Sequence, residues 1–355
     1  MSIPQTPDIL ADAVSFLGQE IGPRAKEIDA DVGALREAID EMALRGLLGL
    51  RVPLEYGGRG LEDKEFRRFQ EACARASGIL AFLQTQHQSA CAMLSKSDNA
   101  PLREAMLPDL ASGRARCGIA FSQLRRKSAT PLLTAEPVEG GFHVKGTAPW
   151  VTGLGFFGHC VSAAVLPDST ALFFLHPLGG ARGITLSPPM KLAAMEAAQT
   201  VSAQFDNYFA REGNVLFVRP EGWIDQNDMV NISLQAPFAL GCAQAGLDIV
   251  AENARRKQIG GISMAHDALL EDLNRCRTEV YAAMDDQPDV GRSLRARAWA
   301  IDLALRCSAA AVVSSSGAGN AASHPAQRVY REALVFAVSA QTAAVMESTL
   351  EQLVR

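Results

Sequence analysis

One short string places an aromatic side chain and a hydroxyl where they could hold a planar ligand. Pro149-Trp150-Val151-Thr152-Gly153 closes a segment with the composition of a strand. Residues two apart on an extended chain lie on the same side, so the Trp150 indole and the Thr152 hydroxyl would face one way. Together they could flank a flat heteroaromatic ring and donate a hydrogen bond to it. The alternative is structural: Trp150 fills the end of a sheet and Thr152 caps a turn.

Three adjacent cations form a second candidate site. Arg125, Arg126 and Lys127 follow one another directly. Cationic side chains so close together could hold a phosphate or a carboxylate. The alternative is a charged loop that is simply solvated. The seven cysteines are scattered and never stand at C-x-x-C spacing, so we expect reduced thiols and no metal site.

Three blocks of different patterning position these residues. In residues 1–115 apolar side chains recur at helical spacings of three and four. Residues 116–218 contain short runs rich in aromatic and β-branched residues, separated by turn signals. Residues 219–355 are rich in Ala and Leu and return to the helical period. Segregated helix, strand and helix blocks predict an α+β architecture rather than an alternating parallel sheet.

Composition excludes several classes of partner. The 355 residues are 48% apolar, which suits a globular protein with a sizeable core. The formal net charge is −5, so no excess of positive charge exists to attract a nucleic acid backbone. The start lacks the pattern of a secretory signal, and no apolar run reaches ~18 residues. We therefore expect a cytoplasmic protein with neither a nucleic acid nor a membrane as partner.

Five strings, in order, carry a resemblance to one protein family. They are VPLEYGG at 52–58, FHVKGTAPWVTG at 142–153, KLAAMEAAQTVSAQFDNY at 191–208, NARRKQIGG at 253–261 and HPAQRVYREALVF at 324–336. The chain resembles the acyl-CoA dehydrogenase superfamily of flavoproteins over essentially its whole length. The resemblance implies an N-terminal helical domain, a middle β-barrel and a C-terminal helical bundle. It also implies bound FAD, with FMN as the alternative, in a homodimer or homotetramer that binds the flavin at a subunit interface.

The resemblance assigns the cofactor contacts residue by residue. They are Trp150, Thr152, Ser122, Arg256, Gly317 and Gly319. Thr152 would hydrogen-bond near the flavin N5, and Arg256 would neutralise the pyrophosphate of FAD bound to a neighbouring subunit. The family's Phe is Ile259 here and its Gln is Val313, and the two glycines could equally form an ordinary turn.

The positions of the family's catalytic base depart from its pattern. Desaturation of an acyl thioester needs a general base that takes the α-proton. The family's glutamate aligns with Ala340, and the alternative position on another helix aligns with Asn231. Neither is a carboxylate. Glu55 and Glu196 are the remaining candidates for a relocated base.

Other polar groups could serve a different reaction. Ser339 and Gln341 flank the missing base, and His87 lies on a helix that lines the substrate cavity in the oxygenase branch of the family. These three are the catalytic candidates, and their alternative role is helix packing. The family's D-x-x-R pair that helps to hold CoA maps to Met229 and Ile232, so CoA itself is in doubt.

Three hypotheses follow from this pattern. The favoured one is a reduced-flavin monooxygenase that acts on a small-molecule substrate and receives its flavin from a separate flavin reductase. The second is a dehydrogenase of an acyl-CoA or acyl-carrier thioester with a relocated base. The third is a non-catalytic homologue.

Overall fold

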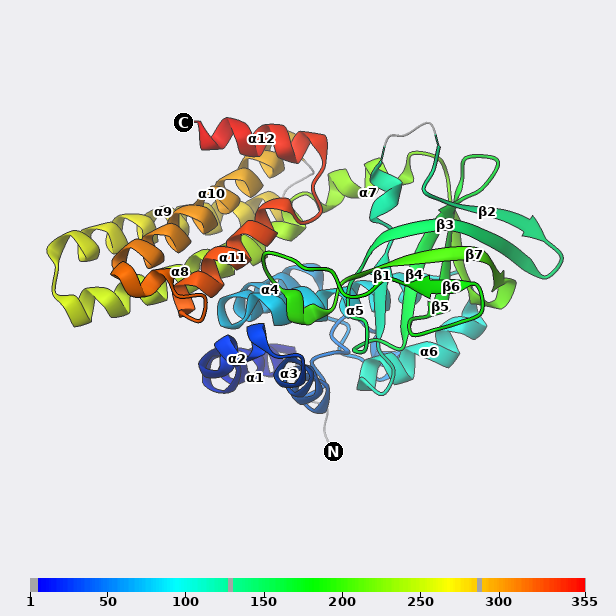
Figure 1. The fold of residues 1–355 in the computed structure, drawn as a ribbon, viewed down its shortest axis with the longest axis horizontal. Helices are drawn as coiled ribbons and strands as arrows, with labels where there is room; N and C mark the ends of the chain where they lie inside the picture. The colour runs from blue at the N-terminus through cyan, green and yellow to red at the C-terminus, as the bar shows by residue number, and fades with distance from the viewer. Residues whose placement is uncertain (1–5, 127–129, 286–288, 355) are drawn as a thin grey trace.

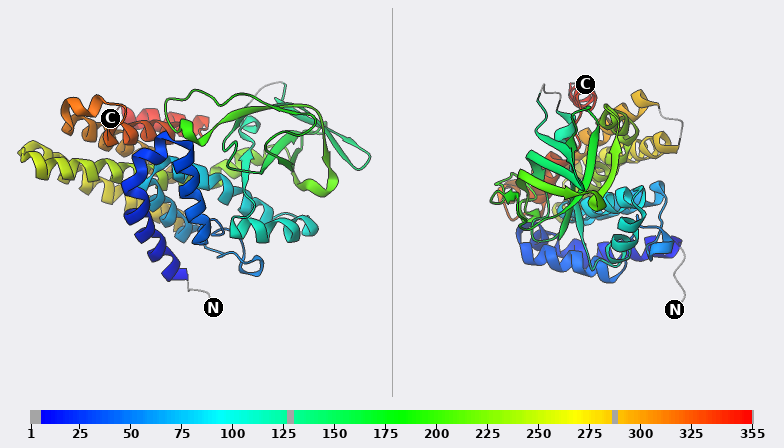
Figure 2. Two further views of the ribbon diagram at one scale, coloured as in Figure 1. Left: turned by 60° about the horizontal axis from the view of Figure 1, so that its bottom comes forward. Right: turned by 90° about the vertical axis from the view of Figure 1, so that its right-hand side faces the viewer.

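In the computed structural model, which describes residues 6–126, 130–285 and 289–354, helices come first, strands next and helices last (Figure 1). The expected α+β class is confirmed. Figure 1 and the left panel of Figure 2 show the strands at one end of the molecule and α8 to α12 at the other, with α1 to α3 on a third side.

The N-terminal group consists of helices separated by capped breaks. They are α1 (Thr6–Phe16), α2 (Ala25–Ala30), α3 (Val32–Leu44), α4 (Asp63–Ala76), α5 (Gly78–Ser95) and α6 (Ala100–Ser112). Asp31, Ser77 and Asn99 precede α3, α5 and α6, and each accepts a hydrogen bond from a backbone N–H in the first turn. Such caps satisfy amides that have no partner inside the helix, so they fix where each helix begins.

The middle group is one eight-stranded sheet. Its strands are β1 (Cys117–Ala120), β2 (Leu133–Val138), β3 (Gly141–Val151), β4 (His159–Val165), β5 (Ala171–Pro177), β6 (Ile184–Leu186), β7 (Val201–Arg211) and β8 (Val215–Arg219). The order is β6-β7-β3-β2-β4-β5-β8, and β1 pairs with β4. Phe174 of β5 and Phe205 of β7 pack with ring centroids 6.0 Å apart although their strands are not neighbours. The sheet therefore curls around an apolar interior.

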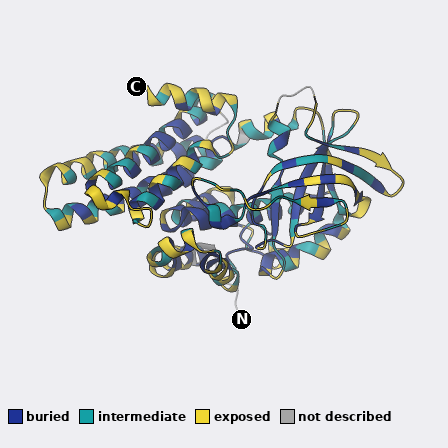
Figure 3. Ribbon diagram, in the orientation of Figure 1, coloured by how far each residue is buried: buried dark blue, intermediate teal, exposed yellow. Residues whose placement is uncertain are grey.

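The C-terminal group is a helical bundle built around α8. Its helices are α7 (Trp223–Asn231), α8 (Ala236–Lys257), α9 (Gly260–Asp285), α10 (Val290–Ser314), α11 (Pro325–Val338) and α12 (Ala343–Leu353). A Cβ at Gly241 would lie 2.2 Å from the carbonyl oxygen of Glu71 on α4, and one at Gly246 would lie 2.8 Å from that of Cys307 on α10. These glycines bring α8 into direct backbone contact with both neighbours. Burial is accordingly concentrated on α4, α5 and α8, whereas α9 and α12 expose a long side (Figure 3).

The part of the chain that the structure describes has neither a membrane-spanning helix nor a cluster of metal-binding side chains. None of the described helices is both long and apolar enough to cross a membrane. The described His, Cys, Asp and Glu side chains form no cluster of three or more that could hold a metal ion.

Candidate active site

The end of β3 carries the Trp150 and Thr152 pair. Trp150 is 53% exposed, while Thr152 is buried and its hydroxyl shares a 3.1 Å hydrogen bond with the hydroxyl of Thr200. Strand β3 ends at Val151, and Gly153 has φ of +97°. The alternation of side chains between the two faces of the strand, on which the expected pairing of Trp150 with Thr152 depends, therefore ends before Thr152. The structure leaves an open indole face beside a hydroxyl that already has one partner.

Ser122 lies in a segment that contacts the same strand. It opens the short helix η4 (Ser122–Arg125), which follows β1 and contacts β3. Its hydroxyl oxygen is buried and has no hydrogen-bond partner among the described residues. A buried hydroxyl without a partner is costly, so this atom is suited to a ligand that supplies an acceptor.

Arg256, Gly317 and Gly319 come together at the far end of the bundle. The Arg256 guanidinium donates to the Asn253 side chain at 3.1 Å, and the Asn253 amide donates to the hydroxyls of Ser314 and Ser315. The glycines follow directly in the short helix η8 (Ser316–Asn320). A Cβ at Gly319 would lie 2.7 Å from the carbonyl oxygen of Val312, whereas Gly317 has open space. Gly319 is thus required by the turn itself.

The turn between α11 and α12 replaces the expected base. Ala340 is exposed and adopts φ of +47°. Ser339 directly follows the last residue of α11, and its hydroxyl donates to the carbonyl oxygen of Val335 in the last turn of that helix. Ser339 therefore caps the C-terminal end of α11. The side-chain oxygen of Gln341 is buried without a partner in the described residues. Of the two residues that flank Ala340, Gln341 has a buried acceptor oxygen without a partner, whereas the proton of the Ser339 hydroxyl is already used.

Arg297 of α10 holds this turn, and sequence reasoning missed it. It is 3% exposed and donates to the carbonyl oxygens of Ser339 at 2.6 Å and Ala340 at 3.3 Å. A third bond, at 3.4 Å, reaches the carbonyl oxygen of Ile232 after α7. Burial lowers its pKa to about 10, so the guanidinium stays charged at neutral pH. No sequence motif marks this residue, because its partners are backbone atoms.

Part of the basic trio is engaged internally. Arg125 forms two hydrogen bonds with Asp228 of α7, at 2.6 and 2.7 Å. Arg126 is exposed, and Lys127 lies outside the described residues. We expected all three cations to bind an external anion. Arg125 does not fit this expectation, because its guanidinium is bonded to Asp228. Asp228 directly precedes Met229, and no sequence motif marks it.

The structure assigns His87 a packing role. It is 0% exposed, its Nδ1 accepts from the backbone N–H of Cys117, and its Nε2 lies 3.2 Å from the carbonyl oxygen of Leu110. Burial lowers its pKa to about 4, so the ring is neutral. His87 ties α5 to α6 and β1 and has no free nitrogen for a substrate. This corrects the expectation that it lines a cavity.

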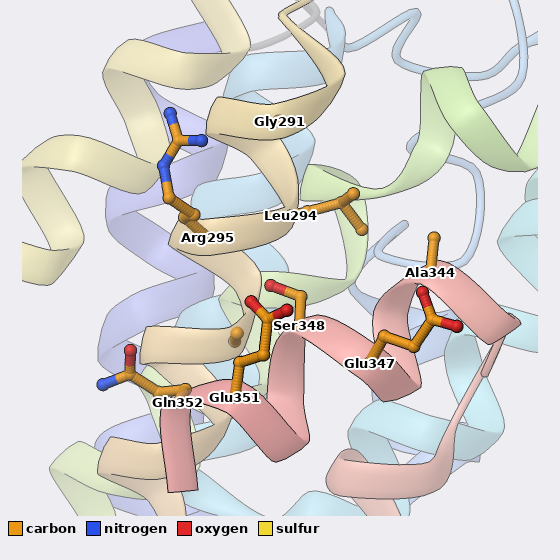
Figure 4. A pocket seen from close by; sticks show the side chains of 9 residues that line it. Gly291, Leu294, Arg295, Ala344, Glu347, Ser348, Glu351 and Gln352 are labelled. Carbon is orange, nitrogen blue, oxygen red and sulfur yellow. The ribbon is translucent and has the colours of Figure 1, made fainter. Parts of the chain in front are cut away.

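Two surface hollows lie near the elements described so far. One, of about 680 Å³, lies between β2, the β4–β5 turn and the start of α7, and its described charged lining residues are Glu136 and Glu221. The other, of about 250 Å³, separates α10 from α12. In Figure 4 the carboxylates of Glu347 and Glu351 line it, while the Arg295 guanidinium points away from them. That second hollow contains no set of groups suited to catalysis.

Comparisons with known proteins identify the family. The family model described as the N-terminal domain of acyl-CoA dehydrogenase matches residues 5–114. The probable acyl-CoA dehydrogenase FadE25 of Mycobacterium tuberculosis is 24% identical over 94% of this chain and 91% of its own length. The chain belongs to the acyl-CoA dehydrogenase superfamily.

Other relatives of this acyl-CoA dehydrogenase-family chain span its whole length. The 3-(aryl)acrylate reductase of Clostridium sporogenes is 23% identical over 95% of each chain. The solved structure of butyryl-CoA dehydrogenase from Megasphaera elsdenii matches 100% of both chains with a TM-score of 0.81 at 21% identity. At that identity the structural likeness establishes the fold alone.

The residues present fit the family's flavin in part. The open Trp150 face and the unpartnered Ser122 hydroxyl suit a planar ring with acceptor atoms. At the other end of the bundle, Ile259 and Val313 are 54% and 79% exposed where the family has an aromatic ring and an amide. The ring end of the cofactor is therefore better matched than the pyrophosphate end.

Proposed function

We propose that this member of a family of flavin oxidoreductases uses its flavin for oxygen transfer to a small molecule, not for α,β-desaturation of an acyl-CoA. The single observation that carries the proposal is the Ala340 turn. Where desaturation needs a carboxylate, the chain presents an exposed methyl group in a turn fixed by Arg297.

The neighbouring acid does not supply the missing base. Asp228 is one of the two carboxylates of α7, the other being Asp225, and α7 is the helix on which the alternative base position lies. Both oxygens of Asp228 accept hydrogen bonds from Arg125. A carboxylate whose two oxygens are both bound to one guanidinium must leave that guanidinium before it can reach a substrate proton. Glu55 and Glu196 lie in the short helices η3 (Leu54–Tyr56) and η5 (Glu196–Ala198), and Glu196 is paired with Lys191.

The hollow of about 680 Å³ between β2, the β4–β5 turn and α7 also argues against CoA. The described residues that line it include two carboxylates, Glu136 and Glu221, and no cationic side chain. Like charges repel, so such a hollow is a poor match for the phosphates of a CoA nucleotide. The apolar Met229 and Ile232 remove a further polar pair at the positions where the resemblance places CoA contacts.

This chain's own residues would hold FAD or FMN in a defined way. Trp150 would cover one side of the ring, Thr152 and Ser122 would hydrogen-bond to its polar edge, and Arg256 from a second copy would reach its phosphates. The bound cofactor, in its reduced form, would supply the electrons that split O2 into one oxygen atom for the substrate and one water. A separate flavin reductase using NAD(P)H would supply those electrons, and the expected setting is the cytoplasm.

A dehydrogenase remains the second candidate, and the relatives favour it. FadE25 is named a probable acyl-CoA dehydrogenase, and the C. sporogenes relative is named a reductase. With Glu55 or Glu196 as its relocated base, this reaction would need one of those carboxylates at the substrate, and with Asp228 as its base it would require Asp228 to leave Arg125 first. The non-catalytic homologue is the third candidate, favoured by the exposed Ile259 and Val313 at the phosphate end.

One experiment separates the three candidates. The purified chain is reconstituted with FAD, and in parallel with FMN, and each preparation is mixed anaerobically with butyryl-CoA, and separately with a flavin reductase and NADH. Flavin reduction by the reductase, followed by O2-dependent reoxidation, with no bleaching by butyryl-CoA, is the expected result. Bleaching by butyryl-CoA would establish the dehydrogenase and overturn the oxygenase. Failure to retain either FAD or FMN would leave the non-catalytic homologue.

A further inference from the structure

Two buried guanidinium groups from different helices converge on the turn between α7 and α8. Arg67 of α4 donates to the carbonyl oxygen of Leu234 at 3.2 Å, and Arg297 of α10 donates to that of Ile232 at 3.4 Å. Their exposed fractions are 8% and 3%. We call this place, Ile232 to Gln235 with the two arginines, the α7–α8 junction.

Neither guanidinium has a carboxylate as partner among the described residues. Arg67 forms its two hydrogen bonds with the side chain of Gln70 and the backbone of Leu234, and all three bonds of Arg297 go to backbone carbonyl oxygens. Burial lowers the pKa of each to about 10, so both stay charged at neutral pH. The junction thus contains two charges that no acid directly neutralises.

The two acids whose charge acts on these arginines are each paired with another arginine. Asp63 interacts with Arg67 only at longer range and forms an ion pair with Arg51 at 2.5 Å. Asp228 likewise interacts with Arg297 at longer range, while both of its oxygens are held by Arg125. Each of these carboxylates is paired with a different arginine, so neither forms an ion pair with Arg67 or Arg297.

The geometry of Arg67 shows which side of it is available. Both of its hydrogen bonds use Nη1, whereas Nε is buried and has no partner in the described part of the chain. The Nε side of a guanidinium is one of the edges that binds a carboxylate through two parallel hydrogen bonds. Close by, Arg297 fixes the Ala340 turn, and the next residue, Gln341, has a buried side-chain oxygen without a partner.

Leaving a buried charge unpaired is expensive, and proteins rarely do so without a reason. We propose that the α7–α8 junction binds the carboxylate group of a small organic acid. That this acid is the substrate rests on the proposed function, because the junction adjoins the turn where the family places its chemistry. The binding site itself stands on the two arginines alone.

Carboxylate binding is measured by calorimetry on the full chain without flavin. The probes are hexanoate, benzoate and phenylacetate, each compared with its uncharged amide and with inorganic phosphate. We expect at least one carboxylate to bind at 1:1 stoichiometry, with its amide and phosphate at least tenfold weaker. Arg67→Met and Arg297→Met should each weaken that binding at least tenfold. Arg114→Met, which changes an exposed arginine paired with Asp109, should leave it unchanged.

Several outcomes would overturn the site. These are no binding of any of the three carboxylates, equal binding of phosphate or of the amides, or equal affinity in the wild type and both methionine variants. Should a methionine variant fail to fold, the corresponding lysine variant replaces it, because lysine keeps the positive charge but cannot donate two parallel hydrogen bonds. Wild-type affinity in Arg67→Lys would contradict bidentate recognition of the carboxylate. Flavin retention is scored separately, so a chain that binds carboxylates and no flavin would refute the proposed function while supporting the site.

Discussion

Arg125 and Asp228 stand 103 residues apart in the sequence and join η4 to α7 through two hydrogen bonds of 2.6 and 2.7 Å. Their side chains are 24% and 12% exposed. The pair connects the middle sheet to the helical bundle beside the candidate active site. It also holds both oxygens of a carboxylate that lies three residues before Asn231 on α7.

Breaking this pair from the cationic side should destabilise the protein. Arg125→Gln leaves Asp228 partly buried without its counterion, and we expect the free energy of unfolding to fall by roughly 2–4 kcal/mol. Urea denaturation measures the change. Arg126→Gln is the matched control, because the neighbouring arginine is exposed and its replacement should cost no more than about 0.5 kcal/mol.

The double variant tests whether the cost comes from the pair. Arg125→Gln with Asp228→Asn removes both charges, so its loss should be smaller than the sum of the two single losses. Strict additivity would show that the two side chains stabilise the fold independently.

Trp150 offers a test of flavin binding that does not depend on stability. Its side chain is 53% exposed, so Trp150→Ala removes little packing. We expect the melting temperature to stay within about 2 °C of the wild type, while the affinity for FAD falls at least tenfold through loss of ring stacking. Fluorescence quenching of added FAD measures the affinity. Phe209→Ala, at a 40% exposed aromatic side chain on β7, is the control, and equal loss of affinity in both variants would refute the assignment.

The sequence predicted the fold well because its blocks are segregated. Helical periodicity and short strand runs are local signals, and the three groups of elements follow the predicted order. The sheet order and the curl that brings Phe174 against Phe205 depend on contacts between distant strands, which no local pattern encodes. The glycines of α8 were missed for the same reason, because Gly241 is required only by the carbonyl of Glu71 on α4.

That close contact between α4 and α8 gives a third prediction. Gly241→Ala places a Cβ 2.2 Å from the Glu71 carbonyl oxygen, so the helices must separate and lose packing. We expect a destabilisation of roughly 1–3 kcal/mol. Gly261→Ala on α9 has nothing within 4 Å and should be neutral or stabilising by up to about 1 kcal/mol. Thermal denaturation of the two variants compares them, and equal effects would show that the α4–α8 contact can relax freely.

Two buried histidines predict how stability depends on pH. Burial lowers the pKa of both His87 and His176 to about 4, whereas an unfolded histidine titrates near about 6.5. Between these values the unfolded chain binds protons that the folded chain does not, so stability falls as the pH drops from about 6.5 to about 4. Each histidine contributes a slope of up to about 1.4 kcal/mol per pH unit.

His87→Gln should reduce the slope of the unfolding free energy against pH in this acidic range by the contribution of one histidine. Urea denaturation at several pH values measures it for the wild type and the variant. The variant should also be less stable at neutral pH, because it disturbs the hydrogen bonds to Cys117 and Leu110. An unchanged slope would mean that His87 is protonated in the folded protein, contrary to its burial.

The candidate site was harder to predict than the fold. Trp150, Ser122 and Ala340 are predictions of the resemblance, which pointed to their positions. Arg67 and Arg297 were not, because their partners are backbone carbonyl oxygens and a glutamine on other elements. His87 was misjudged since a lone histidine on a helix looks the same in sequence whether it faces a cavity or ties three elements together.

Arg328 and Glu332 show how a buried charge behaves when it does have a partner. Both lie on α11, the Arg328 Nη1 is 2.8 Å from each Glu332 oxygen, and the backbone N–H of Gly78 donates to the same carboxylate. Glu332 is 0% exposed. Glu332→Gln leaves the Arg328 guanidinium buried without a counterion, so we expect a loss of about 3–5 kcal/mol in unfolding free energy. Glu347→Gln on the exposed side of α12 should cost no more than about 0.5 kcal/mol.

Removing both charges should restore much of that loss. In Arg328→Met with Glu332→Leu no charge remains buried, and apolar side chains of similar volume fill the space, so stability should recover to within about 1–2 kcal/mol of the wild type. Calorimetric melting of the three variants gives the comparison. If the double variant were as unstable as Glu332→Gln, the bond from Gly78 and not the ion pair would be what holds α11 against α5.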